Sequence, residues 1–329
     1  DPVVSVHDVL SRYFASEDLK IAMSFQAKYL GMSPWECPGA FTILGYSEHA
    51  YGIYHPIGGV HKISESMAEI FLEKGGELNL GQGVKEIIFE GKKAVGVLLE
   101  DGQKKIADEI VMNADFAYGM SSLVPKELRK KYSDSNLSKK KYSCSTFMLY
   151  LGVGKKYDTP HHSVILSKDY RENVEDIFKR KILSRDPSFY VQNASITDPT
   201  LAPEGKSAVY VLVPVANKIG SNINWQEEKN KFRDIIIHKI EERTEMKDLS
   251  AHIEEERIIT PDDWQNSADV YAGAVFNLAH GIDQMLYLRP RNRLEGFSNL
   301  YIVGGGTHPG SGLPTIMESG RITADLISG

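Results

Sequence analysis

The feature that most constrains this chain is a glycine-rich turn near its C-terminal end. An apolar strand is predicted over 300–303, a triple glycine follows at 304–306, and apolar residues recur with helical spacing after Pro314. Glycine allows close backbone approach, and a helix N-terminus presents free N–H groups and a positive dipole end. The pattern therefore predicts a receptor for an anion or dipole above Pro314 and Thr315. The same pattern is also typical of a packing device, and the residues alone leave both interpretations open.

The residues of the turn carry a family resemblance. Gly-Gly-Gly-Thr-His-Pro-Gly-Ser-Gly-Leu-Pro at 304–314 resembles the C-terminal flavin motif of the bacterial-type carotenoid desaturases, which are phytoene and dehydrosqualene desaturases. The resemblance implies FAD as the cofactor, with the helix N-terminus under the flavin pyrimidine ring. It also implies cofactor contacts along the turn and the first helical residues, namely Gly305, Gly306, Thr307, Gly312, Leu313, Pro314, Thr315 and Ile316.

A second block, at 54–115, resembles the same family. Pro56-Ile57-Gly58-Gly59 precedes a predicted helix at 61–74, a short strand is expected at 77–80, and alternation around Gly91 predicts a hairpin of 84–90 and 93–100. The resemblance implies that the backbone of Val84 contacts the FAD adenine, with simple strand packing as the open alternative. It also implies that Asn113, Ala114 and Asp115 mark the point where the chain leaves the cofactor domain.

These elements predict an α/β fold with an α+β substrate part. Helix, strand and β-meander in this order suit the second half of a two-dinucleotide-domain flavoprotein. We expect an incomplete Rossmann-like FAD-binding domain and a mixed-sheet and helical substrate domain. The expected boundaries are 1–56 for the first helices and apolar loop of the substrate domain, 57–118 for the FAD-binding domain, 119–294 for the substrate domain again, and 295–329 for the last part of the FAD-binding domain.

Three short motifs in the expected substrate domain also resemble the family. They are Tyr142-Ser143-Cys144-Ser145, the segment 201–206 and Arg289-Pro290-Arg291-Asn292. The first two lean toward the dehydrosqualene desaturases. Strands are predicted at 146–153 and 207–214, and an amphipathic helix is predicted at 225–243. A strand is also expected over 106–113, and Gly320 is expected to be a close-packing position of the C-terminal helix. Residues 1–31 are expected to be helical, with Ser5 as the cap of a first helix, Ser16 as the cap of a second, and Gly31 at the end of the second.

The phosphate cradle of a dinucleotide flavoprotein is missing. No GxGxxG occurs in the chain, whereas the family places this motif near its N-terminus. The chain opens Asp1-Pro2 without an initiator Met or a signal peptide. We therefore expect that roughly the first third of the family's length is absent. We also expect the chain as given to bind FAD weakly or not at all, and to be inactive alone.

The resemblance implies desaturation of a long isoprenoid polyene in carotenoid biosynthesis. A hydride leaves an allylic carbon for the flavin, and a proton leaves the neighbouring carbon. Backbone N–H groups around 313–316 would stabilise the charge that develops. His308 is the candidate proton acceptor because imidazole titrates in the right range, with orientation of the turn as its alternative role. Asp115 and Glu318 are weaker candidates for the proton acceptor; their alternative roles are a hydrogen-bond anchor for Asp115 and a charge at the helix N-terminus for Glu318.

Composition and charge bear on partners and location. The net charge of −6 gives no reason to expect nucleic acid, and no apolar run reaches the roughly 20 residues of a membrane-spanning helix. Cys37 and Cys144 are expected to be lone core thiols in a reducing compartment, without a metal site. The basic run 139–141 and the similar run 129–131 are solvated faces or attract anionic lipid head groups.

We therefore expect a cytoplasmic protein, peripheral at the inner face of the cell membrane. Its partners are expected to be an isoprenoid lipid substrate and a membrane surface, and its oligomeric state is left open. The aromatic loop at 32–57 lines a pocket, contacts a bilayer or packs inside. The alternatives are another flavoprotein of the superfamily, such as a carotene isomerase, a retinol-saturase-like protein or an amine oxidase, or a non-catalytic lipid-binding subunit. An amine oxidase should bring an aromatic cage beside the flavin, and nothing near the terminal motif supplies one.

Overall fold

The computed structural model describes residues 4–329, and the chain divides into two compact units. Unit 1 comprises the residues to Gly45, Asn79–Ser143 and Gln265–Gly329, and unit 2 comprises Tyr46–Leu78 and Cys144–Trp264. Unit 1 thus joins most of the expected cofactor segments to the first helices and to residues 119–143 and 265–294. Residues 57–78 group with unit 2. The domain boundaries expected from the sequence stay a prediction.

Short capped helices open unit 1. Ser5 accepts a hydrogen bond from Asp8 N in a capping box at α1 (Val6–Leu10), and Ser16 caps α2 (Glu17–Met23). The remaining helices of this region are α3 (Gln26–Tyr29), η1 (Gly39–Thr42) and the start of α4 (Ile43–Tyr51), whose residues from Tyr46 onward belong to unit 2. Gly31 has φ +64°, where its hydrogen atom faces Phe276 and Ser143 and a side chain would collide with both. The predicted caps are confirmed, and Gly31 follows the end of α3, but the single helix expected between Ser16 and Gly31 is divided into α2 and α3.

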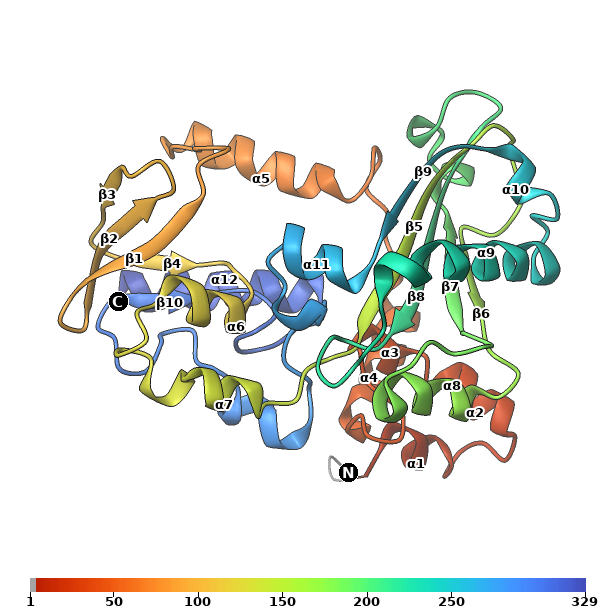
Figure 1. Ribbon diagram of the computed structural model, residues 1–329, viewed down its shortest axis with the longest axis horizontal. Helices are drawn as coiled ribbons and strands as arrows, with labels where there is room; N and C mark the ends of the chain where they lie inside the picture. Colours follow the sequence, from red (N-terminus) through yellow and green to blue (C-terminus); the bar gives the residue numbers. More distant parts are fainter. Residues whose placement is uncertain (1–3) are drawn as a thin grey trace. The chain divides into compact units, whose positions relative to one another are not determined.

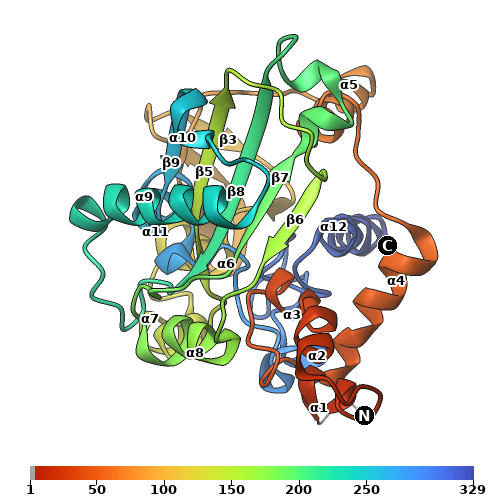
Figure 2. The same cartoon turned by 90° about the vertical axis from the view of Figure 1, so that its right-hand side faces the viewer.

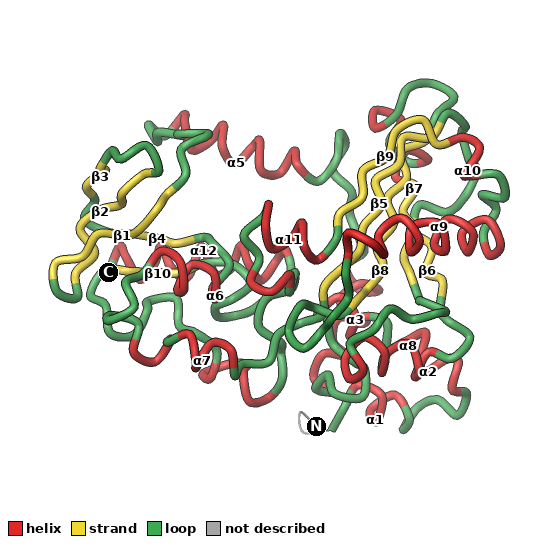
Figure 3. The backbone as a smooth tube through the Cα atoms, viewed as in Figure 1, coloured by secondary structure: helices red, strands yellow, loops and turns green. Residues whose placement is uncertain are grey.

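Two small sheets form the rest of the framework of unit 1 (Figure 3). Strands β1 (Val84–Glu90), β2 (Lys93–Leu99) and β3 (Lys104–Ile106) make an antiparallel meander, which confirms the predicted hairpin. Strand β4 (Ile110–Met112) pairs in parallel with β10 (Leu300–Ile302). The helical elements that follow β4 are α6 (Phe116–Tyr118), η2 (Gly119–Leu123), η3 (Lys130–Tyr132) and α7 (Asp134–Ser138). The turns η7 (Tyr271–Gly273), η8 (Ile282–Gln284) and η9 (Leu286–Leu288) precede β10, and α12 (Leu313–Ser328) follows it.

Unit 2 is built on a five-stranded antiparallel sheet of order β6-β7-β8-β5-β9. Strand β5 (Ser145–Val153) pairs with β8 (Ser207–Val215) over its whole length. Both strands match their predicted ranges within one residue. The other strands are β6 (His162–Ile165), β7 (Phe189–Asn193) and β9 (Ile253–Ile259). The helices and turns of this unit are α5 (His61–Glu73), α8 (Tyr170–Glu175), η4 (Asp176–Arg180), η5 (Ala194–Ile196), η6 (Pro199–Leu201), α9 (Trp225–Arg243), α10 (Leu249–His252) and the first part of α11 (Pro261–Ser267).

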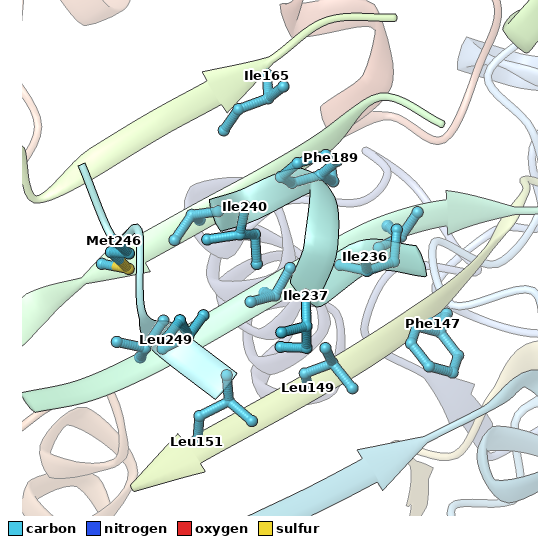
Figure 4. Close-up of a cluster of buried hydrophobic side chains, with 14 of the residues drawn as sticks. Phe147, Leu149, Leu151, Ile165, Phe189, Ile236, Ile237, Ile240, Met246 and Leu249 are labelled. Carbon is cyan, nitrogen blue, oxygen red and sulfur yellow. The ribbon is translucent and has the colours of Figure 1, made fainter. Parts of the chain in front are cut away.

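Helix α9 covers one face of this sheet (Figure 2). Its Ile236, Ile237 and Ile240 pack with Phe147 and Leu149 of β5 in a cluster of buried side chains (Figure 4). Asn224 caps the helix by accepting a hydrogen bond from Gln226 N. The predicted helix over 225–243 is confirmed, and burial of its apolar stripe is what fixes it to the sheet.

Two elements differ from the sequence expectations. Residues 77–80 form no strand, and no strand of residues 4–329 pairs with them. The expected strand at 106–113 is divided between the end of β3 and β4, because Ala107–Glu109 turn between the two sheets. Helix α5 forms as predicted but buries none of its residues, and Ile70 and Phe71 of its apolar face are exposed.

Candidate functional site

The candidate site lies where the two parallel strands of unit 1 end together (Figure 1). Ile302 of β10 is in register with Met112 of β4, and Val303 N donates to Met112 O over 3.1 Å. Because parallel strands end at the same edge of a sheet, the residues that follow both strands meet there. A Cβ placed on Gly304 would lie 3.1 Å from Asn113 Oδ1. The structure thus brings 113–115 and 304–306 together.

The glycines of the turn are needed mainly by the chain itself. A Cβ on Gly305 would lie 2.9 Å from Ser311 Oγ, and one on Gly306 would lie 2.4 Å from Phe116 Cβ. The space that these two glycines leave open is therefore filled by neighbouring parts of unit 1. This supports the packing interpretation for Gly305 and Gly306.

The buried guanidinium of Arg289 holds the turn. Its Nε donates to Thr307 O over 3.1 Å, and Nη2 donates to Gly305 O over 2.5 Å and to Leu278 O over 3.1 Å. Nη1 lies 3.4 Å from Ala279 O. The side chain is 2% exposed, and burial lowers the pKa of Arg289 to about 10. The guanidinium is thus still charged at neutral pH, and the acceptors that stabilise its charge are main-chain carbonyl groups.

Asn292, three residues later, fixes the next part of the turn. Its Nδ2 donates to His308 O over 3.0 Å, and Thr307 Oγ1 donates to Pro290 O over 2.6 Å. His308 N also donates to Pro290 O. Sequence reasoning recognised Arg-Pro-x-Asn as a family-like motif but gave it no role. The motif has two strongly polar side chains, Arg289 and Asn292, shortly before the glycines at 304–306. That position was the signal that could have assigned it a role in holding the turn.

Residues 276–280 support the turn from another segment. Ser311 N donates to His280 Nε2 over 3.0 Å, and Ser311 Oγ donates to Phe276 O over 2.7 Å. His280 is 2% exposed, and burial lowers the pKa of its imidazole to about 3. The ring is therefore neutral with its proton on Nδ1, which has no hydrogen-bond partner among residues 4–329. Sequence reasoning missed His280, because nothing in its local sequence indicates this long-range contact.

Asp115 caps α6 and anchors the same segment. Its Oδ1 accepts from Tyr118 N over 3.0 Å, and its Oδ2 accepts from Asn277 Nδ2 over 2.5 Å. Burial raises the pKa of the Asp115 carboxyl to about 6, against the opposing effect of these hydrogen bonds. This geometry fits the role of hydrogen-bond anchor, which the sequence analysis gave as the alternative to proton acceptor for Asp115. Glu318 forms an exposed ion pair with Arg321.

The N-terminus of α12 is open toward a ligand. Gly312, with φ +114°, precedes the helix, and no side chain caps it. Pro314 carries no N–H, and Ile316 N donates to Gly312 O over 2.9 Å. Within the described residues 4–329, the N–H groups of Leu313 and Thr315 therefore have no acceptor. Both residues are accessible, so this end of the helix fits the expected receptor for a negative group.

His308 lies in a different surrounding from the helix N-terminus. Its side chain lines a cavity of about 610 Å³ together with Tyr287, Arg291, Arg293 and Leu326. None of residues 312–316 lines that cavity. The role of His308 as a proton acceptor stays a prediction, and the structure gives its main chain a clear part in holding the turn.

Val84 begins β1, where it pairs with Leu99 and is exposed. A register irregularity between Val84 and Glu86 interrupts the regular ladder. The predicted contact of Val84 with the adenine stays a prediction.

Among residues 4–329, no group of His, Cys, Asp and Glu could hold a metal ion. Cys37 and Cys144 are buried and form no disulfide.

Within the described range, no helix combines the length and apolar character that a bilayer-spanning segment requires.

The sequence matches the family described as flavin containing amine oxidoreductase over residues 4–328. It is 52% identical over 324 residues to a 4,4'-diapophytoene desaturase (4,4'-diapolycopene-forming) of a Methylomonas species, covering 98% of this chain and 63% of that protein. It is 39% identical over 331 residues to an all-trans-zeta-carotene desaturase of Myxococcus xanthus, covering 99% of this chain and 62% of that protein. These matches confirm the resemblance to carotenoid desaturases, and the chain spans about three fifths of each of these relatives.

A solved structure confirms the α/β fold. An oxidoreductase from Methanosarcina mazei superposes with a TM-score of 0.65 at 20% identity, covering 99% of this chain and 68% of that one. At this identity the likeness concerns the arrangement of the elements and not the reaction.

Proposed function

Because the chain belongs to the flavin-containing amine oxidoreductase family, we propose that it is the larger part of an FAD-dependent desaturase of a long isoprenoid polyene, acting in carotenoid biosynthesis. The observation that carries the proposal is the uncapped N-terminus of α12 at the end of the glycine-rich turn. FAD, when bound, supplies the redox chemistry by accepting a hydride from an allylic carbon of the substrate. The remaining work, which is binding and orientation, falls to the residues of the chain.

Leu313 and Thr315 would hold the electron-rich end of the flavin through their free N–H groups. Such donors are positioned by the fold before the reaction, and they stabilise charge where it develops. Arg289 and Asn292 would not contact the cofactor; they fix the carbonyl groups of Gly305, Thr307 and His308 so that α12 begins at a defined place. Gly305, Gly306 and Thr307 would shape the turn, and Val84, Asn113, Ala114 and Asp115 belong to the proposed cofactor side.

His308 is the proposed proton acceptor. His308 lines a cavity of about 610 Å³ that has apolar walls formed by Leu286, Phe297 and Leu326 but includes none of residues 312–316, so this role requires the polyene to reach from the N-terminus of α12 into the cavity. A general base must reach the proton that it removes. Replacing His308 with Gln in the full-length protein should therefore lower turnover while leaving flavin bound. Unchanged turnover would assign His308 only to the turn.

Dehydrosqualene is the proposed substrate, in preference to phytoene. Two observations support this preference. The motifs Tyr142–Ser145 and Leu201–Lys206 resemble those of dehydrosqualene desaturases, and the chain is 52% identical to a protein named 4,4'-diapophytoene desaturase. The lipid is expected to be taken from a membrane surface by a peripheral protein on the cytoplasmic side, at the inner face of the cell membrane.

The test is to restore the complete reading frame, load the protein with FAD, and supply dehydrosqualene and phytoene separately. We expect new conjugated products from dehydrosqualene, detected by their visible absorbance, and little conversion of phytoene. A flavin-loaded protein that converts neither substrate would contradict the proposed function. The chain of 329 residues alone is expected to elute from gel filtration without yellow flavin.

A further inference from the structure

An apolar tip projects from unit 1 beside a run of lysines. Leu286, Tyr287 and Leu288 of η9 have 60%, 91% and 64% of their surface exposed. Gln284, which is buried, donates to Lys141 O over 2.8 Å and accepts from Lys141 N over 3.0 Å. This segment therefore lies beside the chain that leaves α7 (Figure 1). We call Leu286–Leu288 together with Lys139–Lys141 the basic loop surface.

The tip is held out by the fold and is not a loose loop end. The buried Gln284 fixes the segment before it, and the buried Arg289 fixes the segment after it. Leu286 has φ +53°, a left-handed conformation that branched and bulky residues adopt only when neighbouring contacts impose it. Three large side chains are thus kept in solvent by buried polar anchors on both sides. Exposed apolar patches of this kind mark interaction surfaces.

Positive charge surrounds the tip although the whole chain has a net charge of −6. Two carboxylates, Asp283 and Glu295, lie among a larger number of basic side chains and pair with some of them. These basic residues are Lys131, Lys139, Lys140, Lys141, Arg291 and Arg293. Arg291 and Arg293 also line the cavity of about 610 Å³ whose wall includes Leu286 and Tyr287. The apolar tip therefore stands beside a cavity whose lining has more basic than acidic side chains, since Glu295 is its one carboxylate.

We propose that the basic loop surface docks the protein on an anionic lipid bilayer. Leu286, Tyr287 and Leu288 would enter the headgroup region, where an amphipathic Tyr side chain is well placed. The surrounding lysines and arginines would lie at the level of the lipid phosphates. This inference rests on the proposed function, because it specifies the surface through which a lipid substrate would be collected.

Charge distinguishes this surface from the other exposed apolar stretches. Residues 43–60 expose Tyr46, Tyr51 and Tyr54, but this stretch contains no Lys or Arg. Helix α5 exposes Ile70 and Phe71 beside Glu65, Glu69 and Glu73, and the one lysine within the helix, Lys62, is paired with Glu65. A bilayer with anionic lipids would repel an acidic face and attract a basic one. The occupant that fits the basic loop surface is therefore an anionic membrane.

The test is cosedimentation of the full-length protein with vesicles of phosphatidylcholine alone or of phosphatidylcholine with phosphatidylglycerol. We expect binding to the anionic vesicles that weakens with added salt. Replacing Lys139, Lys140 and Lys141 with Gln should weaken it about 100-fold, at about fivefold for each charge removed. Replacing Leu286, Tyr287 and Leu288 with Ser should abolish the part of the binding that persists at high salt.

A matched control lies on β3, in the same unit. Lys104→Gln with Lys105→Gln removes exposed charge, and Ile106→Ser removes an exposed apolar side chain. Neither change should alter vesicle binding by more than about twofold, because these residues lie outside the basic loop surface. Circular dichroism of each variant should match the unchanged protein.

Three results would overturn the inference. They are equal binding to neutral and anionic vesicles, unchanged binding after both sets of loop substitutions, and loss of binding only when Ile70 and Phe71 of α5 are replaced. Turnover measured with substrate in detergent micelles separates this inference from the proposed function. Binding that depends on the loop in a protein without desaturase activity would keep the docking surface and contradict the reaction. Activity in detergent micelles without vesicle binding would support the proposed reaction and contradict the docking surface.

Discussion

Arg289 Nη2 lies 2.5 Å from the carbonyl oxygen of Gly305, and this contact joins a buried positive charge to the glycine-rich turn. None of the ion pairs among residues 4–329 involves Arg289. The charge is instead shared among carbonyl groups of two chain segments, 278–279 and 305–307. A planar guanidinium can serve such divergent acceptors because its five N–H groups point in fixed directions.

Replacing Arg289 with Lys should destabilise the protein and release flavin. A single ammonium group cannot reach acceptors that lie on opposite sides of a guanidinium, so buried carbonyls would lose their donors at about 1–3 kcal/mol each. We expect the free energy of unfolding to fall by about 3 kcal/mol or more. Chemical denaturation of the chain and flavin retention by the full-length protein measure the two effects. Arg291→Lys, at an exposed position, is the control and should change neither.

The Asp115 carboxyl should contribute less to the free energy of unfolding as pH rises from about 4 to about 6. The carboxyl has a pKa of about 6 in the folded protein and an ordinary value of 3.8. Since the folded pKa is the higher one, the group contributes stability below the ordinary pKa and loses it as pH rises through the folded pKa. In Asp115→Asn this component disappears. The free energy of unfolding of the unchanged protein minus that of the variant should therefore fall over this range by up to about 3 kcal/mol. A difference that is flat with pH would contradict the assignment.

His280 should act in the opposite direction. Its pKa in the folded protein is about 3, below the ordinary value of 6.5. Its contribution is therefore complete above pH 6.5 and decreases as pH falls toward 3, by about 1.4 kcal/mol for each pH unit. His280→Gln retains an acceptor for Ser311 N and removes the titration. If the unfolding free energies of both proteins fall in parallel below pH 6.5, His280 is not the group responsible.

Local signals in the sequence predicted the elements well. The limits of α9 (Trp225–Arg243), the caps Ser5 and Ser16, and the hairpin around Gly91 all follow from spacing and cap chemistry. These features depend on residues a few positions apart. The expected strand at 77–80 failed for the same reason, because a strand needs a partner and its own residues do not show whether one is present.

The supporting structure of the site depends on contacts that no local pattern shows. Gly304–Gly306 marked the turn, yet Arg289 and His280, which hold it, became visible only through their long-range hydrogen bonds. Glycine itself was an ambiguous signal. A Cβ on Gly306 would collide with Phe116, whereas one on Gly320, expected from the sequence to be a close-packing position, would meet open space. Two glycines thus have different roles, and only the atoms around each of them show the difference.

The N–H group of Leu313 gives a direct test of the proposed receptor. Replacing Leu313 with Pro removes that donor and little else. The residue is the first of α12, where proline is well tolerated. The ψ of Gly312, 141°, lies in the range that a following proline favours, and glycine has no Cβ to collide with the proline ring. Leu313→Ala is the matched control, since it shortens a side chain that is half exposed and retains the N–H group.

In the full-length protein, Leu313→Pro should weaken flavin binding at least tenfold, because a hydrogen bond to a charged group contributes about 1.5–3 kcal/mol. The flavin potential should also become more negative, by about 30 mV for each 1.4 kcal/mol of lost preference for the reduced form. Leu313→Ala should change affinity by less than about twofold and leave the potential unchanged. Titration followed by flavin fluorescence and a spectroscopic redox titration measure the two quantities. If both variants behave like the unchanged protein, this end of α12 does not contact the flavin, and the open N–H groups must face another ligand or solvent.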